Sequence, residues 1–236
     1  MKPIRIFRHL VCKPPGYLGD YLQQRDIPWE VECVDESHGI NPRTDDVSAL
    51  VFMGAGVSVN DQLSWMDGEL TLIRKALQED LPILGVCFGA QMMSRAMGGE
   101  VTRGGEMEIG WHPVRGIPEN DHEEWLSGLP ERFMAFHWHA DTFTLPKGSR
   151  WIMESDCYPH QGFTLGDHLG LQFHLEMTPE MVKGWIDRYG SDLQPNSTCC
   201  QSAENILQDL EQHIAQLHEI SAIIYGNWLE RVLRRQ

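Results

Sequence analysis

The stretch PILGVCFGAQMMSRAMGG, residues 82–99, puts a cysteine between two glycines at the junction of a strand and a helix. Residues 82–86 form a short apolar run that predicts a strand, and residues 90–97 carry helix formers with apolar residues at helical spacing. The glycine pair that follows is typical of a helix end. Cys87 therefore lies on an abrupt strand-to-helix turn, which is where an α/β protein presents a nucleophile.

The turn around Cys87 suits a reactive thiol. It brings strand and helix very close, and Gly85 and Gly89, which lack a Cβ, relieve the crowding. The thiol also lies at a helix N-terminus, whose partial positive charge favours thiolate over thiol. We predict that Cys87 is an exposed nucleophile; the alternative is a buried cysteine in a glycine-flanked turn.

A second segment, GLQFHLEMTPE at residues 170–180, supplies a base and an acid. Its apolar and polar residues alternate with the period of a strand that has one face of each kind: Leu171, Phe173 and Leu175 against Gln172, His174 and Glu176. His174 and Glu176 consequently point the same way, and with a cysteine they can form a Cys/His/acid triad. The alternative is a solvated polar face.

Together, GVCFGAQ and QFHLE resemble the nucleophile segment and the HxE strand of class I glutamine amidotransferases. The likeness is strongest to the stand-alone branch related to the glutaminase domain of GMP synthase, and it covers nearly the whole chain. Four more segments resemble that family in the same order: FMGAGVSVND (52–61), EIGWHPV (108–114), HWHADTFTLP (137–146) and YGNWLERVL (225–233).

This resemblance implies a glutaminase mechanism. Cys87 would attack the side-chain carboxamide of glutamine, His174 would protonate the leaving nitrogen and then activate water, and Glu176 would orient His174. Backbone N–H groups would stabilise the oxyanion, at Phe88 and at Ala55 or Gly56. The substrate-binding residues it implies are Gly54, Gln91, Trp138, His139 and Ala140. It implies neither a cofactor nor a metal.

Two positions depart from the family pattern. The oxyanion loop commonly reads Gly-Gly-Pro, whereas this chain has Gly54, Ala55 and Gly56. The proline between histidine and glutamate is here Leu175, whose greater freedom is expected to loosen the orientation of Glu176. Neither departure removes a reacting side chain, so we expect an active enzyme.

The order of predicted elements favours an α/β fold, and the family resemblance implies the flavodoxin-like type of class I glutaminases. Strands are expected at 4–8, 29–34, 49–53 and 82–86, helices at 17–25, 65–79, 90–97 and 178–189, and added antiparallel strands over 101–176. Alternating strands and helices imply a mostly parallel sheet flanked by helices. We predict a single domain over 1–236, in which terminal helices within 191–236 pack on the same core or cover a partner.

Composition excludes several classes of protein. The net charge of −15 disfavours nucleic-acid binding, and no run approaches the length of a membrane span. The start runs directly into a strand pattern without an apolar leader. The six cysteines show no motif spacing and are expected to be reduced, which favours a cytoplasmic location.

The fate of the ammonia stays open. The chain has neither a GxxxxGK[ST] phosphate loop nor an SGGxDS signature. A separate synthase subunit could accept the ammonia, or the enzyme could hydrolyse γ-glutamyl amides or peptides for their own sake.

Two alternatives belong to other classes of protein. One is a metal-binding protein in which the pair His137 and His139 joins His174 and Glu176. The other is a non-catalytic regulator that keeps the fold.

Overall fold

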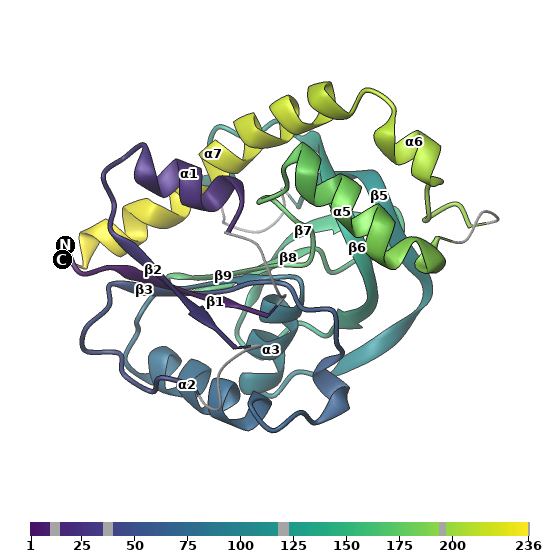
Figure 1. Cartoon of the computed structure of the whole chain (residues 1–236). Coiled ribbons are helices and arrows are strands. Elements are labelled where there is room, and N and C mark those ends of the chain that lie inside the picture. The colour runs from purple at the N-terminus through teal and green to yellow at the C-terminus, as the bar shows by residue number, and fades with distance from the viewer. Residues whose placement is uncertain (10–14, 35–39, 118–122, 194–196, 236) are drawn as a thin grey trace.

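The computed structural model describes residues 1–9, 15–34, 40–117, 123–193 and 197–235. Its strands form one mixed sheet in the order β2-β1-β3-β4-β9-β8-β7-β5-β6 (Figure 1). The strands are β1 (Ile4–Arg8), β2 (Trp29–Cys33), β3 (Ala49–Phe52), β4 (Ile83–Val86), β5 (Val101–Gly116), β6 (Arg132–Phe143), β7 (Arg150–Ser155), β8 (Gly162–Leu165) and β9 (His168–Leu171).

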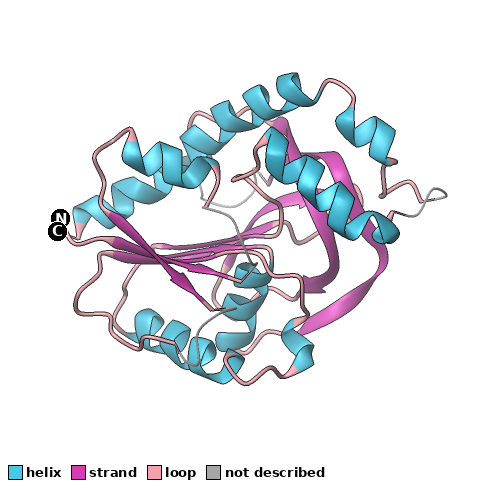
Figure 2. Cartoon of the chain, viewed as in Figure 1, coloured by secondary structure: helices cyan, strands magenta, loops and turns pink. Residues whose placement is uncertain are grey.

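Helices cover both faces of the sheet (Figure 2). In Figure 1, α2 and α3 lie on one side, whereas α1, α5, α6 and α7 lie on the other. The helices are α1 (Tyr17–Gln23), α2 (Met66–Gln78), α3 (Phe88–Ala96), α4 (Glu123–Leu126), α5 (Pro179–Tyr189), α6 (Ala203–Leu207) and α7 (Leu210–Arg234), with 3₁₀ turns η1 (Val59–Asp61) and η2 (Gly190–Asp192).

The parallel half of the sheet separates two hydrophobic cores. Strands β2, β1, β3, β4 and β9 pair in parallel. Because side chains alternate along a strand, β3 sends Val51 into the core under α1 and α7, and Phe52 into the core under α2 and α3. Both faces are therefore buried, and ligands have access only at the strand ends.

The antiparallel half extends the sheet from β9 through β8, β7, β5 and β6. Its long β5–β6 hairpin carries an irregularity between Arg103 and Glu108. In Figure 1 this hairpin curves past the carboxyl end of the parallel strands toward α5. The α/β architecture and the antiparallel additions over 101–176 are thus confirmed.

The terminal helices that the sequence predicts within 191–236 differ greatly in length. A short α6 is followed by one continuous helix of 25 residues, α7. Gln208 is extended and Asp209 has φ 52°, so the break falls just before Leu210. The buried residues of α7, such as Leu217 and Trp228, belong to the core that lies under α1 and α7.

The prediction that all cysteines are reduced is wrong for two of them. Cys157 and Cys199 form a disulfide across 42 positions of sequence, a separation that no spacing rule identifies. Cys33 and Cys87 are free, and Cys12 lies outside the described residues. The argument from reduced cysteines for the cytoplasm is therefore lost, and that location stays a prediction.

Among the helices of the described residues, none combines the length and the apolar character needed to cross a bilayer.

Candidate active site

The nucleophile turn has the sharp geometry that the sequence predicts. Cys87 follows β4 directly and caps α3 with φ 51° and ψ −107°, a left-handed conformation that is strained for a residue with a side chain. Its N–H donates to the Leu171 carbonyl at 2.7 Å. A Cβ at Gly89 would come within 2.0 Å of the Phe52 carbonyl oxygen, and one at Gly85 within 2.8 Å of the Ala90 nitrogen. Both glycines are therefore needed for the close approach of strand and helix.

The segment that carries His174 and Glu176 is not a strand, which corrects the prediction. Strand β9 ends at Leu171, and His174 makes only an isolated bridge with Phe136. Distant contacts hold the segment instead: Ser221 Oγ donates to the Leu175 carbonyl at 2.9 Å, and the His218 ring contacts the Met177 carbonyl at 2.9 Å. These anchors from α7 fix the segment without the proline of the family pattern.

His174 and Glu176 do point the same way, and both are buried. The Nδ1–H of His174 donates to Glu176 Oε1 at 2.7 Å, while its Nε2 has no hydrogen-bond partner among the described residues. Burial alone would lower the pKa of His174, but the Glu176 carboxylate and the Cys87 sulfur raise that pKa to about 10. The direction of this shift favours the protonated ring, which can donate from Nε2.

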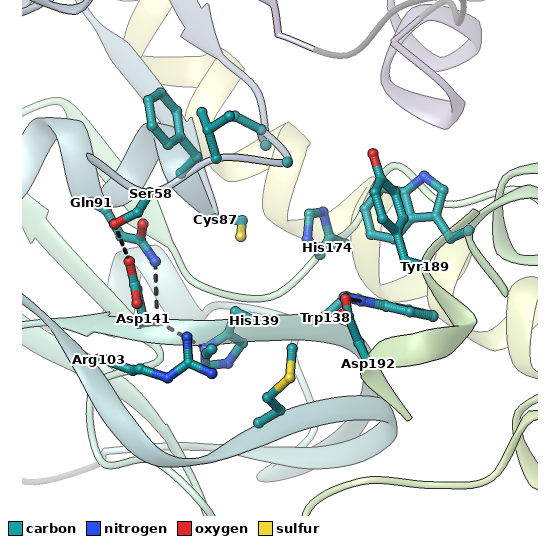
Figure 3. Close-up of a pocket in the computed structure, with 18 of the residues that line it drawn as sticks. Ser58, Cys87, Gln91, Arg103, Trp138, His139, Asp141, His174, Tyr189 and Asp192 are labelled. Carbon is teal, nitrogen blue, oxygen red and sulfur yellow. Dashed lines mark hydrogen bonds between the residues drawn. The ribbon is translucent and has the colours of Figure 1, made fainter. Parts of the chain in front are cut away.

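Cys87, His174 and Gly54 converge at one point. A Cβ placed on Gly54 would lie 2.9 Å from His174 Cε1 and 3.7 Å from Cys87 Cβ. All three residues line one cavity of about 290 Å³ (Figure 3). Cys87 is 6% exposed, so the thiol lies at the foot of this cavity and not on an exposed tip as the sequence suggested.

The cavity wall contains nearly all the residues that the family resemblance implies. Only Glu176 is missing from it, because it lies behind His174. The implied residues on the wall are Gly54, Ala55, Gly56, Cys87, Phe88, Gln91, Trp138, His139, Ala140 and His174.

The loop 54–56 tolerates alanine at its centre. Ala55 is not among the described non-glycine residues with positive φ, so the position does not require glycine. Gly54 is different, because a side chain there would collide with His174. The departure from Gly-Gly-Pro at Ala55 is therefore compatible with this backbone.

Gln172 is a buried neighbour of Cys87 that the sequence interpretation did not single out. Its Nε2 donates to Cys87 Sγ at 3.6 Å, and its Oε1 accepts from Gln91 Nε2 at 3.3 Å. Gln91 Nε2 also donates to the Asp141 carbonyl at 3.0 Å. In the sequence, Gln172 shares the polar face of its segment with His174, and this pattern was the available indication of its position.

Charged and aromatic residues complete the cavity, and sequence reasoning had not assigned them. Near Gln91, Ser58 Oγ donates to Asp141 Oδ2 at 2.5 Å, and Arg103 lies close by (Figure 3). Beyond His174 the wall consists of Trp185, Tyr189 and Asp192, from α5 and η2. No family motif marks these positions in the sequence.

The expected metal-ligand set is wrong in its composition. Among the described residues, the group that could hold a metal is Glu108, His137 and His139, whose ligand atoms lie within 4.8 Å of one another. Glu108 comes from β5 opposite His139 of β6. His174 and Glu176 are not part of this cluster.

Hydrogen-bond donors already surround the Glu108 carboxylate. Its Oε2 accepts from His139 Nε2 at 2.8 Å and from Gln161 Nε2 at 2.6 Å, and its Oε1 accepts from Ser155 Oγ at 2.6 Å. Burial acts to raise the pKa of Glu108, but His137 and His139 hold that pKa well below its usual range. We interpret the cluster as a buried charge network that joins the strands beside the cavity.

Comparison with known proteins identifies the family. The model of the class I glutamine amidotransferase family matches residues 18–184. The chain belongs to this family. A glutamine amidotransferase-like protein of Salmonella typhimurium, YfeJ, is 27% identical over 173 residues, which are 71% of this chain and 72% of that protein. One of the subunits of the glutamine-hydrolysing GMP synthase from Sulfurisphaera tokodaii is 28% identical over 72% of this chain and 84% of its own.

Solved structures of glutamine amidotransferases share the complete fold. The enzyme from Methylobacillus flagellatus superposes with a TM-score of 0.93 at 35% identity, covering 98% of this chain and 95% of that one. The glutamine amidotransferase of Thermotoga maritima gives a TM-score of 0.84 at 26% identity, with 98% of both chains covered. The resemblance to class I glutamine amidotransferases is therefore confirmed at the level of family and fold.

Proposed function

We propose that this chain hydrolyses the side-chain amide of glutamine or of a γ-glutamyl compound through a thioester on Cys87. The observation that carries the proposal is the convergence of three features on one cavity in a class I amidotransferase: a cysteine on a strained turn, a His174 whose Nε2 has no hydrogen-bond partner among the described residues, and Glu176 behind it. Nucleophile, proton donor and orienting acid are the parts that such a reaction needs.

The reaction follows from these positions. The Cys87 thiolate attacks the carboxamide carbon, and His174 gives its Nε2 proton to the leaving nitrogen as the C–N bond breaks. His174, now neutral, takes a proton from water, which attacks the thioester and releases glutamate. Glu176 stabilises the imidazolium and holds the ring in the tautomer that presents Nε2 to the cavity.

Backbone donors stabilise the tetrahedral oxyanion in this proposal. The N–H of Phe88 lies at the N-terminus of α3, and the loop 54–56 faces it across Cys87. We assign substrate contacts to Gly54, Trp138, His139 and Ala140. Gln91 would act through Oε1, because its amide nitrogen already donates to Asp141 and Gln172.

Replacing Cys87 with Ala tests the proposal. The variant keeps the fold and loses the nucleophile, so glutamate release from glutamine should fall by about 10⁴-fold or more. Cys200→Ala is the matched control, because Cys200 is also a buried cysteine but does not line the cavity. Equal activity of Cys87→Ala and the native protein would contradict the proposed mechanism.

The destination of the ammonia is a further part of the proposal. The relative from Sulfurisphaera tokodaii is named as one subunit of a GMP synthase, which supports a separate ammonia-accepting synthase subunit for this chain as well. Release of ammonia from glutamine by the purified chain at full rate would favour an independent hydrolase. Activity that rises only when a partner is added would favour the separate synthase.

A further inference from the structure

The cavity has two chemically different ends on either side of the catalytic pair. One end, near Cys87, is lined by polar side chains that include Ser58, Gln91 and Arg103 (Figure 3). The other end, beyond His174, is lined by Trp138, Trp185, Tyr189 and Asp192, which we call the aromatic recess. A site that only released ammonia would leave this second end unfilled.

The position of the proton donor identifies the aromatic recess as the leaving-group end. In the proposed function, on which this inference rests, His174 Nε2 protonates the leaving nitrogen and so lies next to it. The rings of His174 and Trp185 are perpendicular, with centroids 4.8 Å apart. Any substituent on that nitrogen therefore extends past His174 against Trp185.

The aromatic recess has the chemistry of a cation site. The Trp138 ring lies 6.0 Å from Trp185 and 6.3 Å from Tyr189, both at steep angles, so the three rings surround a common space. The Asp192 carboxylate accepts from Trp138 Nε1 at 3.1 Å and brings a negative charge to the same wall. Aromatic faces and a carboxylate attract an organic ammonium group.

The charged residues on the cavity wall also favour a cation. This wall carries three aspartates, Asp61, Asp141 and Asp192, against one arginine, Arg103. The α-amino and α-carboxylate groups of a γ-glutamyl substrate cancel, and Asp192 is the aspartate of this wall that lies at the aromatic recess, where the leaving group would be. A leaving group with a carboxylate of its own would be repelled.

We propose that the preferred substrate is a γ-glutamyl amide of a cationic amine, such as the monoamide of a diamine. The Cys87 sulfur forms a bond to the γ-carbonyl carbon while the C–N bond breaks, and His174 supplies the proton that the departing amine needs. The diamine leaves the aromatic recess, and water then hydrolyses the thioester to glutamate and free Cys87. Glutamine is the smallest member of the same substrate series.

A matched series of substrates tests this proposal. The γ-glutamyl amides of 1,4-diaminobutane, of pentylamine and of 4-aminobutanoate place a cation, a methyl group and an anion at one position, and glutamine has no substituent. We expect kcat/KM for glutamate release to be at least about tenfold higher for the cationic than for the neutral amide, and lowest for the anionic one.

Asp192→Asn tests the assigned residue. The substitution keeps an oxygen that can accept from Trp138 and removes only the charge, so the ratio of cationic to neutral kcat/KM should fall several-fold toward one. Asp187→Asn is the control, because Asp187 is exposed on the adjoining helix α5 and does not line the cavity. Asp187→Asn should keep the ratio of the native protein.

The outcomes separate the two proposals. Turnover of glutamine with equal or lower kcat/KM for the cationic amide than for the neutral one overturns the cation site and leaves the glutaminase proposal standing. An Asp192→Asn variant with an unchanged ratio also overturns it. Failure to release glutamate from any of the four compounds contradicts the proposed function itself, and the cation site with it.

Discussion

Among the described residues, two buried histidine–carboxylate clusters beside the cavity use the same groups for different ends. In the cluster at the cavity, which we propose to be catalytic, His174 pairs with Glu176 and keeps Nε2 free toward the cavity. In the strand cluster, Glu108 accepts from His139, Gln161 and Ser155, and His137 Nδ1 lies 3.2 Å away. One carboxylate orients a ring that can exchange a proton, and the other is saturated by donors from three neighbouring strands and turns.

The pKa values of His174 and His137 are shifted in opposite directions in the two clusters. Burial opposes protonation of both rings, but Glu176 and Cys87 outweigh it and raise the pKa of His174. At His137 burial prevails over Glu108, and its pKa is lowered. A buried histidine beside a carboxylate therefore does not by itself indicate catalysis; a free ring nitrogen in a cavity with a nucleophile does.

Removing the charge of each carboxylate should separate catalysis from stability. Glu176→Gln leaves His174 without its orienting acid, so kcat should fall by about 10²-fold or more with a smaller change in stability. Glu108→Gln breaks a buried charge network and should lower the free energy of unfolding by about 3 kcal/mol. Steady-state kinetics and urea unfolding of both variants provide the measurement.

This pair of variants can contradict the comparison in a definite way. If Glu108→Gln lost activity as strongly as Glu176→Gln while remaining folded, the strand cluster would also belong to the catalytic machinery. A circular dichroism spectrum like that of the native protein at the assay temperature is the required control.

Local patterns predicted the parts of the site that local contacts determine. The turn at Cys87 follows from neighbours within four positions, and α5 begins where Thr178 and Pro179 indicate, with Thr178 Oγ accepting from the Met181 N–H at 3.3 Å. The conformation of residues 172–176 was not predictable in this way, because it depends on Ser221 of α7. The alternating pattern predicted correctly that His174 and Glu176 point the same way, but it did not predict that strand β9 ends at Leu171.

The sequence alone could not show which residues of neighbouring strands contact one another. His137 and His139 were singled out as a pair, but Glu108 is 31 positions from His139, and only the register of β5 and β6 brings the two together. The aromatic recess is similar, because the helical pattern of α5 places Trp185 and Tyr189 on a helix without showing what that helix faces. A pattern in one sequence shows which residues share a face of a helix or strand. Only the fold shows which other element that face contacts.

Two buried glutamines extend the comparison to a finer level. Gln172 donates to Cys87 Sγ, and Gln161 donates to Glu108 Oε2. Gln172→Leu removes one hydrogen bond to the reacting sulfur, so kcat and the rate of Cys87 alkylation should fall by about tenfold, which corresponds to about 1.4 kcal/mol. Gln161→Leu should lower stability by about 1–3 kcal/mol and leave the alkylation rate near that of the native protein. Alkylation rates that respond equally to both substitutions would contradict the separate roles.

The two histidines should give opposite pH dependences of stability. The pKa of His174 rises from its ordinary 6.5 to about 10 on folding, so its contribution is complete below pH 6.5 and is lost as pH rises toward 10. The pKa of His137 is lowered by burial, so its neutral folded form costs stability as pH falls below 6.5. His174→Gln should therefore flatten the decline in unfolding free energy between about pH 7 and 10, whereas His137→Gln should flatten the decline below about pH 6.5. Urea unfolding across this range measures both slopes, and an alkaline decline that persists unchanged in His174→Gln would show that His174 is not the group that holds the proton.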